Sequence, residues 1–187
     1  SGSSALKTFL ETRMDVDQFL RAYAVNVMVG MWDDYWHGQN NYYFYFDENN
    51  KFYFIPFDYD NTLGTSMGMN AGTQNMLTWG SLENDRVLMR KVMSITEYKE
   101  RYKNYIKELA SADNDYFYTD KSLARIQQWH TMISPYLAND TGEDMLLNDV
   151  PAGWGNCSFY RLLTGNDQGG NSGEANWFKT KIKSINF

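Results

Sequence analysis

The residues best suited to chemistry lie between Asp33 and Gly64. Acidic and amide side chains form three groups there, Asp33-Asp34, Asn40-Asn41 and Asp58-Tyr59-Asp60-Asn61. Their oxygen atoms are the ligands that Mg²⁺, Mn²⁺ and Ca²⁺ prefer, whereas Zn²⁺ would require His or Cys residues that this segment largely lacks. These acidic and amide side chains are therefore consistent with a site for a divalent cation that in turn binds phosphate.

The order of these residues also suits phosphoryl transfer. That reaction needs a carboxylate to orient the acceptor hydroxyl, an amide and a second carboxylate to bind metal, and a glycine that frees the metal-binding loop. Asp33, Asn41, Asp58 and Gly64 occur in that order. The residues alone leave open a rival interpretation, a structural calcium site in the loop from Asp58 to Asn61.

Two predicted elements would position these groups. Apolar residues at three-and-four spacing over 16–28 predict a buried helix that Asp15 caps and that ends at Asp33. The aromatic stretches 42–46 and 51–55 flank an Asx-rich turn and predict a β-hairpin, which Pro56 ends. The hairpin would return Asp58 to the side of Asp33.

The remaining chain is predicted to be mostly helical. Helices are expected from about residue 85, where Ser94 and Glu97 have the spacing of a capping box, and again from about 119 and 177. Residues 65–81 and 139–175 are rich in small and polar residues and predict irregular loops. The expected fold class is therefore α+β, mainly helical, as a single domain over 1–187.

Composition excludes several classes of protein. The net charge of -6 disfavours nucleic acid and anionic membrane surfaces, and no apolar run is long enough for a membrane span. The single cysteine, Cys157, excludes an internal disulfide and a CxxC metal site. Aromatic residues make up 17% of the chain, so we expect some of them to line a binding surface.

Three strings resemble the CotH (spore-coat protein H) family of atypical protein kinases. They are Trp32-Asp33-Asp34-Tyr35-Trp36, Asn40-Asn41-Tyr42-Tyr43-Phe44-Tyr45 and Ile55-Pro56-Phe57-Asp58-Tyr59-Asp60-Asn61-Thr62-Leu63-Gly64. The resemblance covers roughly residues 15–137. It implies an atypical protein-kinase-like C-lobe that transfers the γ-phosphate of ATP to protein Ser hydroxyls with Mg²⁺ or Mn²⁺.

The resemblance also implies roles for individual residues. Asp33 would be the catalytic residue that orients the acceptor, with Asp34 as the alternative. The implied metal-binding residues are Asp58, Asn41 and Asp60. The implied supporting residues are Asp34, His37, Asn61 and Gly64.

A kinase-like enzyme also needs an N-lobe, with a phosphate-covering loop and a Lys paired to an acidic residue. Only fourteen residues precede the first predicted helix, so we expect this chain to be a fragment whose activity requires that missing lobe. The chain shows no targeting segment, and the resemblance implies an extracellular, spore-surface or cell-surface location.

Two rival functions remain open at this stage. One is a non-catalytic extracellular module that binds carbohydrate or a protein partner and holds a structural Ca²⁺ ion. The other is a glycoside hydrolase that uses two of the carboxylates. Under the kinase interpretation the partner is a protein substrate, and otherwise it is an extracellular protein assembly.

Overall fold

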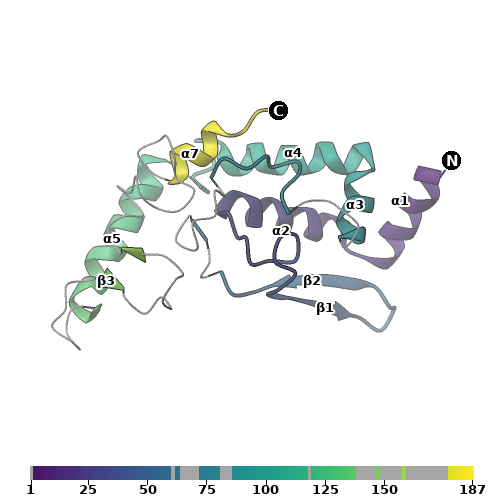
Figure 1. The fold of residues 1–187 in the computed structure, drawn as a ribbon, viewed down its shortest axis with the longest axis horizontal. Coiled ribbons are helices and arrows are strands. Elements are labelled where there is room, and N and C mark those ends of the chain that lie inside the picture. Colours follow the sequence, from purple (N-terminus) through teal and green to yellow (C-terminus); the bar gives the residue numbers. More distant parts are fainter. Residues whose placement is uncertain are drawn as a thin grey trace. The chain divides into compact units, whose positions relative to one another are not determined.

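A computed structural model describes residues 2–59, 62–63, 72–80, 86–117, 119–137, 146–147, 157–158 and 177–187. The chain forms two compact units (Figure 1). The first comprises residues 1–60, 75–108 and 187, and the second comprises 61–74 and 109–186. The sequence predicted a single domain over 1–187. Whether the two units form one domain depends on how they associate, so this expectation stays a prediction.

The first unit contains four helices and one hairpin. Its elements are α1 (Gly2–Arg13), α2 (Val16–Val29), β1 (Tyr42–Phe46), β2 (Phe52–Pro56), α3 (Val87–Met93) and α4 (Thr96–Ala110), whose last turn passes into the second unit. The second unit contains α5 (Asp120–Leu137), the short strands β3 (Leu146–Leu147) and β4 (Cys157–Ser158), and α7 (Trp177–Lys183). The prediction of a mainly helical α+β chain is confirmed.

The N-terminal helices differ from the prediction in two ways. Residues 2–13, expected to precede the first helix, form α1. Asp15 caps α2 as predicted, because its Oδ1 accepts a hydrogen bond from the Gln18 amide at 3.0 Å. However, Gly30 adopts a left-handed conformation with φ of 65° and ends α2 at Val29, so the prediction that Asp33 ends this helix is wrong.

The hairpin forms as predicted, with its second strand one residue later in the chain. Strands β1 and β2 pair antiparallel, with Tyr42 opposite Pro56 and Phe46 opposite Phe52. The turn closes through a hydrogen bond from the Asn50 amide to the Asp47 carbonyl, and Asn50 has a φ of 57°. An Asx residue tolerates that left-handed conformation, which explains why this four-residue segment reverses the chain.

Helix α2 packs directly against the hairpin. The Gln18 side chain bonds both backbone groups of Phe54, donating to its carbonyl at 2.6 Å and accepting from its amide at 3.2 Å. The rings of Phe19, Trp36 and Phe54 pack together at centroid distances of 4.9 to 5.5 Å, and all three are buried. Burial of side chains of this size contributes roughly 2 to 3 kcal/mol each.

Helix α4 lies on the other side of α2, where Tyr102 stacks on Tyr23 at 4.7 Å. The predicted capping box at its start is wrong. Ser94 instead ends α3, and its hydroxyl donates to the Lys91 carbonyl. Helix α4 begins at Thr96, because Ile95 provides the carbonyl that accepts its first backbone hydrogen bond, from Lys99.

In the second unit, α5 begins after Thr119, whose hydroxyl accepts from the Ser122 amide, and it holds Pro135 in its last turns as expected. Strands β3 and β4 pair within a segment predicted to be irregular. The predicted C-terminal helix is confirmed as α7. Across the described residues, no helix has the length and apolar character that a membrane crossing requires.

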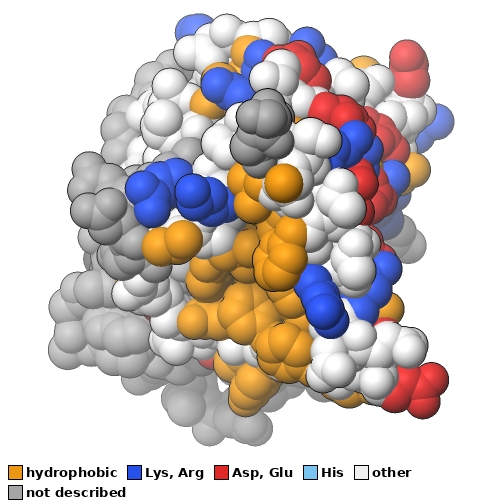
Figure 2. Space-filling view, turned by 90° about the vertical axis from the view of Figure 1, so that its right-hand side faces the viewer, with side chains coloured by type: hydrophobic (Ala, Val, Ile, Leu, Met, Phe, Trp, Pro, Cys, Tyr) orange, Lys and Arg blue, Asp and Glu red, His pale blue; other side chains and the backbone are white. Residues whose placement is uncertain are grey.

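Several large apolar side chains remain exposed in the first unit. Figure 2 views the molecule from the side of α1 and the hairpin turn, and hydrophobic side chains gather on this face. Phe9 of α1 and Phe46 of β1 are 60% and 59% exposed. On the hairpin, Tyr43 and Tyr45 are also exposed. Part of the aromatic excess is therefore exposed, and the expectation that some of these rings line a binding surface stays a prediction.

Candidate functional site

Asp33 and Asn41 meet at the open end of the hairpin. The side-chain amide of Asn41 donates to Oδ2 of Asp33 at 3.2 Å, and the amide of Asn40 donates to the same oxygen at 3.3 Å. Asn41 is 8% exposed and Asp33 is half-buried. Two neutral donors on one oxygen hold the carboxylate in a fixed orientation while leaving its negative charge in place.

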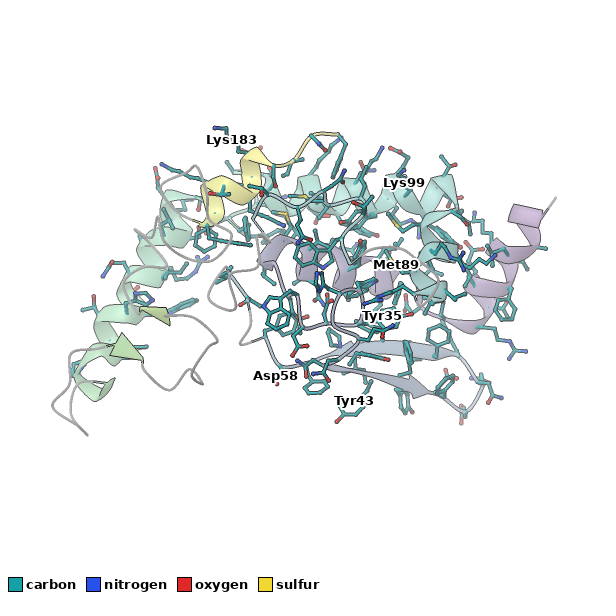
Figure 3. The ribbon with its side chains drawn as sticks, in the orientation of Figure 1. Tyr35, Tyr43, Asp58, Met89, Lys99 and Lys183 are labelled. Atoms are coloured by element: carbon teal, nitrogen blue, oxygen red, sulfur yellow. The ribbon has the colours of Figure 1, made fainter. Side chains whose placement is uncertain are left out.

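The backbone brings Asp58 close to this pair. The Phe57 amide donates to the Asn41 carbonyl at 3.1 Å, directly after the last strand pair. Figure 3 shows Asp58 at the open end of the hairpin, away from the 47–50 turn. Asp58 is exposed and has a φ of 60°, and Asn41 has a φ of 52°. Both residues adopt a left-handed conformation that Asn and Asp tolerate better than most side chains.

Asp34 has a different environment from its neighbour. Its side chain is fully buried, Oδ1 accepts from the His37 amide at 2.8 Å, and Oδ2 accepts from the Asn26 side-chain amide at 3.1 Å. Burial raises the pKa of Asp34 to about 7, although these two hydrogen bonds favour the charged form. The structure therefore places Asp34 in the interior, where it fixes the loop.

Asn26 connects Asp34 to the segment that carries Asp58. The Tyr59 hydroxyl donates to Oδ1 of Asn26 at 2.7 Å, while Nδ2 of the same amide donates to Asp34. Burial, and then the negative charge of Asp34, raise the pKa of Tyr59 to about 12. Tyr59 thus stays protonated at neutral pH and remains a donor.

The loop between α2 and the hairpin is also held from outside by Arg86 and Gly80. Arg86 donates to the carbonyl of Trp36 at 2.9 Å and to the carbonyl of His37. Gly80 has a φ of 77°, and a Cβ atom there would lie 2.0 Å from the Trp36 carbonyl oxygen. Only glycine permits this close approach of two backbones.

The His37 ring lies near Trp79, and the charge of Asp33 also acts on it. The His37 ring lies 6.0 Å from the Trp79 ring and is half-buried. Burial lowers the pKa of His37, and the nearby Arg86 charge lowers it further. His37 is therefore neutral at pH 7 and supports the loop through its backbone amide, which donates to Asp34.

Asp60, Asn61 and Gly64 lie outside the described residues, so their predicted roles stay predictions. Within the part of the chain that the structure describes, no three His, Cys, Asp or Glu side chains are grouped as metal ligands. Asp58 offers an exposed carboxylate, and Asn41 offers its amide Oδ1, since its Nδ2 donates to Asp33. This oxygen donor set fits Mg²⁺ or Mn²⁺, with further ligands coming from water or phosphate.

Sequence reasoning missed four residues that build this site. Asn26 could have been found, because it is an amide on the otherwise apolar or aromatic buried stripe of α2. Tyr59 lies inside the third string of the family resemblance, but its contact with Asn26 spans 33 positions, and no local pattern indicates it. Arg86 and Gly80 act on residues more than forty positions earlier, and no pattern in the sequence indicates such contacts.

Comparison with known proteins identifies the family of this chain. A family model described as CotH kinase protein matches residues 2–165. Relatives from Rhizopus delemar include Invasin CotH3, 36% identical over 72 residues, and Spore coat protein homolog 1, 32% identical over 97 residues. These matches cover 37% and 50% of this chain.

The chain spans only 12% and 16% of the length of those two relatives. A third relative, Invasin CotH2 of the same organism, is 37% identical over 67 residues, which are 35% of this chain and 11% of that protein. No solved structure matches the chain. The family model covers most of the chain, including Asp33, Asn41 and Asp58, and the chain therefore belongs to the CotH kinase protein family.

Proposed function

We propose that this chain is the catalytic-loop portion of a CotH-type protein kinase, which transfers the γ-phosphate of ATP to Ser hydroxyls of a protein substrate. The observation that carries the proposal is the pairing of Asp33 with Asn41, together with the backbone hydrogen bond that brings the Asp58 segment to the same place. Phosphoryl transfer depends mainly on positioning and on charge neutralisation, which such a cluster supplies.

Asp33 is the residue that orients the acceptor hydroxyl. Its carboxylate is half-buried and held through one oxygen, Oδ2, so Oδ1 can accept the proton of an incoming Ser hydroxyl. Both oxygens of Asp34, the alternative, already accept hydrogen bonds in the interior. The catalytic role is therefore assigned to Asp33, and Asp34 supports the loop.

Asp58 is the principal metal-binding residue, supported by the Asn41 amide oxygen and by Asp60. A bound Mg²⁺ or Mn²⁺ ion would bridge phosphate oxygens and neutralise the charge that develops on them. The exposed position of Asp58 and its left-handed backbone direct the carboxylate away from the hairpin ladder. Gly64 and Asn61 would shape the loop that follows.

The proposed location is extracellular or at a spore or cell surface, and the proposed partner is a surface protein. The relatives named invasin and spore coat protein homolog support this location. The exposed ring of Tyr43, which stacks at 4.9 Å on the Phe57 ring directly before Asp58, is one surface that a protein substrate could contact.

The test uses Asp58→Asn in the longest polypeptide that contains this chain. Asn removes the charge but tolerates the φ of 60°, so it isolates metal binding from backbone strain. We expect loss of Mn²⁺-dependent ATP binding by calorimetry, and a fall in phosphoryl transfer by roughly a hundredfold or more. Asp113→Asn, at an exposed position of the second unit, is the matched control and should leave both unchanged.

The proposed function would be abandoned if the wild-type polypeptide bound no ATP in the presence of Mg²⁺ or Mn²⁺. In that case Ca²⁺-dependent thermal stabilisation, present in the wild type and absent from Asp58→Asn, would favour the structural calcium site.

A further inference from the structure

The two acidic segments of the candidate site share a pattern that the family assignment does not explain. In each, the residue directly after the outer carboxylate bonds the same buried side chain. Asp33 is half-buried at the hairpin mouth while Asp34 is fully buried, and Asp58 is exposed while Tyr59, 37% exposed, directs its hydroxyl inward. The two inward residues contact the same side chain, that of Asn26 in α2.

The geometry of Asn26 suits a bridge between the two segments. Its side chain is fully buried, its Oδ1 lies 2.7 Å from the Tyr59 hydroxyl, and its Nδ2 lies 3.1 Å from Oδ2 of Asp34. A carboxylate can only accept hydrogen bonds and a protonated tyrosine hydroxyl is here the donor, so the connecting group must accept at one end and donate at the other. A primary amide does both, and Asn is the shortest side chain that carries one.

Helix α2 makes this bridge rigid. Asn26 lies in its last turn, before the Gly30 cap, and Met31 donates to the Asn26 carbonyl at 2.9 Å. The same helix is fixed to β2 through Gln18 and Phe54. The amide therefore has little freedom to move, and any displacement of Tyr59 or Asp34 would leave a buried polar group without its partner.

We propose that the hydrogen-bonded chain Asp34–Asn26–Tyr59 is a positioning device that fixes the distance and orientation of Asp58 relative to Asp33. Asp33 is the sequence neighbour of Asp34, and Asp58 is the sequence neighbour of Tyr59, so one peptide unit joins each outer carboxylate to a member of this hydrogen-bonded chain. Asn26 and Tyr59 are positioning residues that do not touch substrate. The consequence for phosphoryl transfer rests on the proposed function, whereas the consequence for the loop itself does not.

Two substitutions break the hydrogen-bonded chain of Asp34, Asn26 and Tyr59 at different points. Tyr59→Phe deletes the hydroxyl and keeps the ring, and Asn26→Leu replaces the amide by an apolar group of similar volume. Tyr102→Phe is the control, because it also deletes one tyrosine hydroxyl that donates a hydrogen bond, here at 2.7 Å to the Met76 carbonyl, from a more deeply buried ring. The Tyr102 hydroxyl bonds the Met76 carbonyl and is not part of the hydrogen-bonded chain of Asp34, Asn26 and Tyr59.

The first measurement is amide hydrogen exchange of residues 57–59 without ligand, in the longest polypeptide that contains this chain. We expect exchange about tenfold faster in Tyr59→Phe and Asn26→Leu, and unchanged exchange there in Tyr102→Phe. Equal acceleration in all three variants, or none in the first two, would overturn the proposal, since the loop would then respond only to general stability.

The second measurement separates positioning from a purely structural role. We expect the Mn²⁺ concentration for half-maximal phosphoryl transfer to rise roughly fivefold to tenfold in Tyr59→Phe, with the thermal midpoint lowered no more than in Tyr102→Phe. If the Mn²⁺ concentration for half-maximal transfer were unchanged while amide exchange of residues 57–59 was faster, the proposed effect of Tyr59 on Asp58 would be overturned. If the wild type showed no metal-dependent ATP binding while exchange still responded as expected, the loop-positioning chain would stand and the kinase function would fail.

Discussion

Asn41 lies eight residues after Asp33, and its side-chain amide nevertheless bonds Oδ2 of that carboxylate at 3.2 Å. The contact depends on the backbone of Asn41, whose φ of 52° turns the chain from the loop into β1. One residue therefore has two tasks, an unusual backbone conformation and a hydrogen bond to the candidate catalytic carboxylate. Substitutions at this position can separate the two.

We predict that Asn41→Ala destabilises the protein more than Asn41→Gly does. Both variants lose the hydrogen bond to Asp33, which costs about 1 to 2 kcal/mol. Ala adds the strain of a left-handed backbone, roughly 1 kcal/mol, whereas Gly adopts that conformation without steric strain. Urea denaturation would give the order, and equal midpoints for the two variants would contradict the backbone conformation described above.

We predict that the buried carboxyl of Asp34 makes stability depend on pH. Its pKa of about 7 in the folded protein exceeds the ordinary value of 3.8, so the folded state binds the proton more tightly than the unfolded state does. The resulting stabilisation is complete below about pH 4 and is lost as the pH rises through about 7. The steepest loss is about 1.4 kcal/mol per pH unit.

The comparison with Asp34→Asn isolates this effect. His37 has a lowered pKa and contributes the opposite pH dependence, but it does so in both proteins, so it cancels in the difference. The free energy of unfolding of the wild type minus that of Asp34→Asn should decrease between pH 4 and pH 7. A difference that stays constant over this range would mean that Asp34 does not titrate there.

We predict that Gly80→Ala destabilises the protein by more than about 2 kcal/mol, because a methyl group would overlap the Trp36 carbonyl and the backbone has a φ of 77°. Gly38→Ala is an informative comparison. The Cβ atom there would lie 2.7 Å from Oδ1 of Asp33 and 3.1 Å from the Asp33 Cα atom, so its nearest contact is a side-chain oxygen and not the backbone. Thermal unfolding should show the larger loss for Gly80→Ala, while Gly38→Ala should mainly disturb Asp33.

We predict that Gln18→Leu lowers the free energy of unfolding by about 2 kcal/mol, which is more than the loss of an exposed hydrogen bond would cost. The Gln18 amide occupies the place of a neighbouring strand at the edge of β2, and its loss leaves the amide and carbonyl of Phe54 without these partners. Gln18→Glu keeps the acceptor and loses the donor, so it should leave the Phe54 carbonyl unpaired. Denaturant unfolding of the two variants would check whether the donor or the acceptor contributes more.

The sequence by itself determined the local elements around the site. Aromatic-rich stretches on either side of four Asx-type and acidic residues specify the hairpin, because strand propensity and turn chemistry are local properties. Asp15 specifies the start of α2 for the same reason. The predicted hairpin also led us to expect Asp58 beside Asp33. The structure shows the Asn41 side chain bonded to Asp33 and the Phe57 amide bonded to the Asn41 carbonyl, and a site shared by Asp33, Asn41 and Asp58 stays a prediction.

Only the tertiary structure decided which of two adjacent acids faces the interior. Asp33 and Asp34 are identical in sequence terms, and their different burial arises because α2 ends early, at Gly30, and the following loop is fixed by Arg86 and Gly80 from a distant segment. The bridge from Asp34 through Asn26 to Tyr59 is likewise invisible to periodicity. Long-range hydrogen bonds depend on how separate elements pack, and local sequence patterns do not encode that packing.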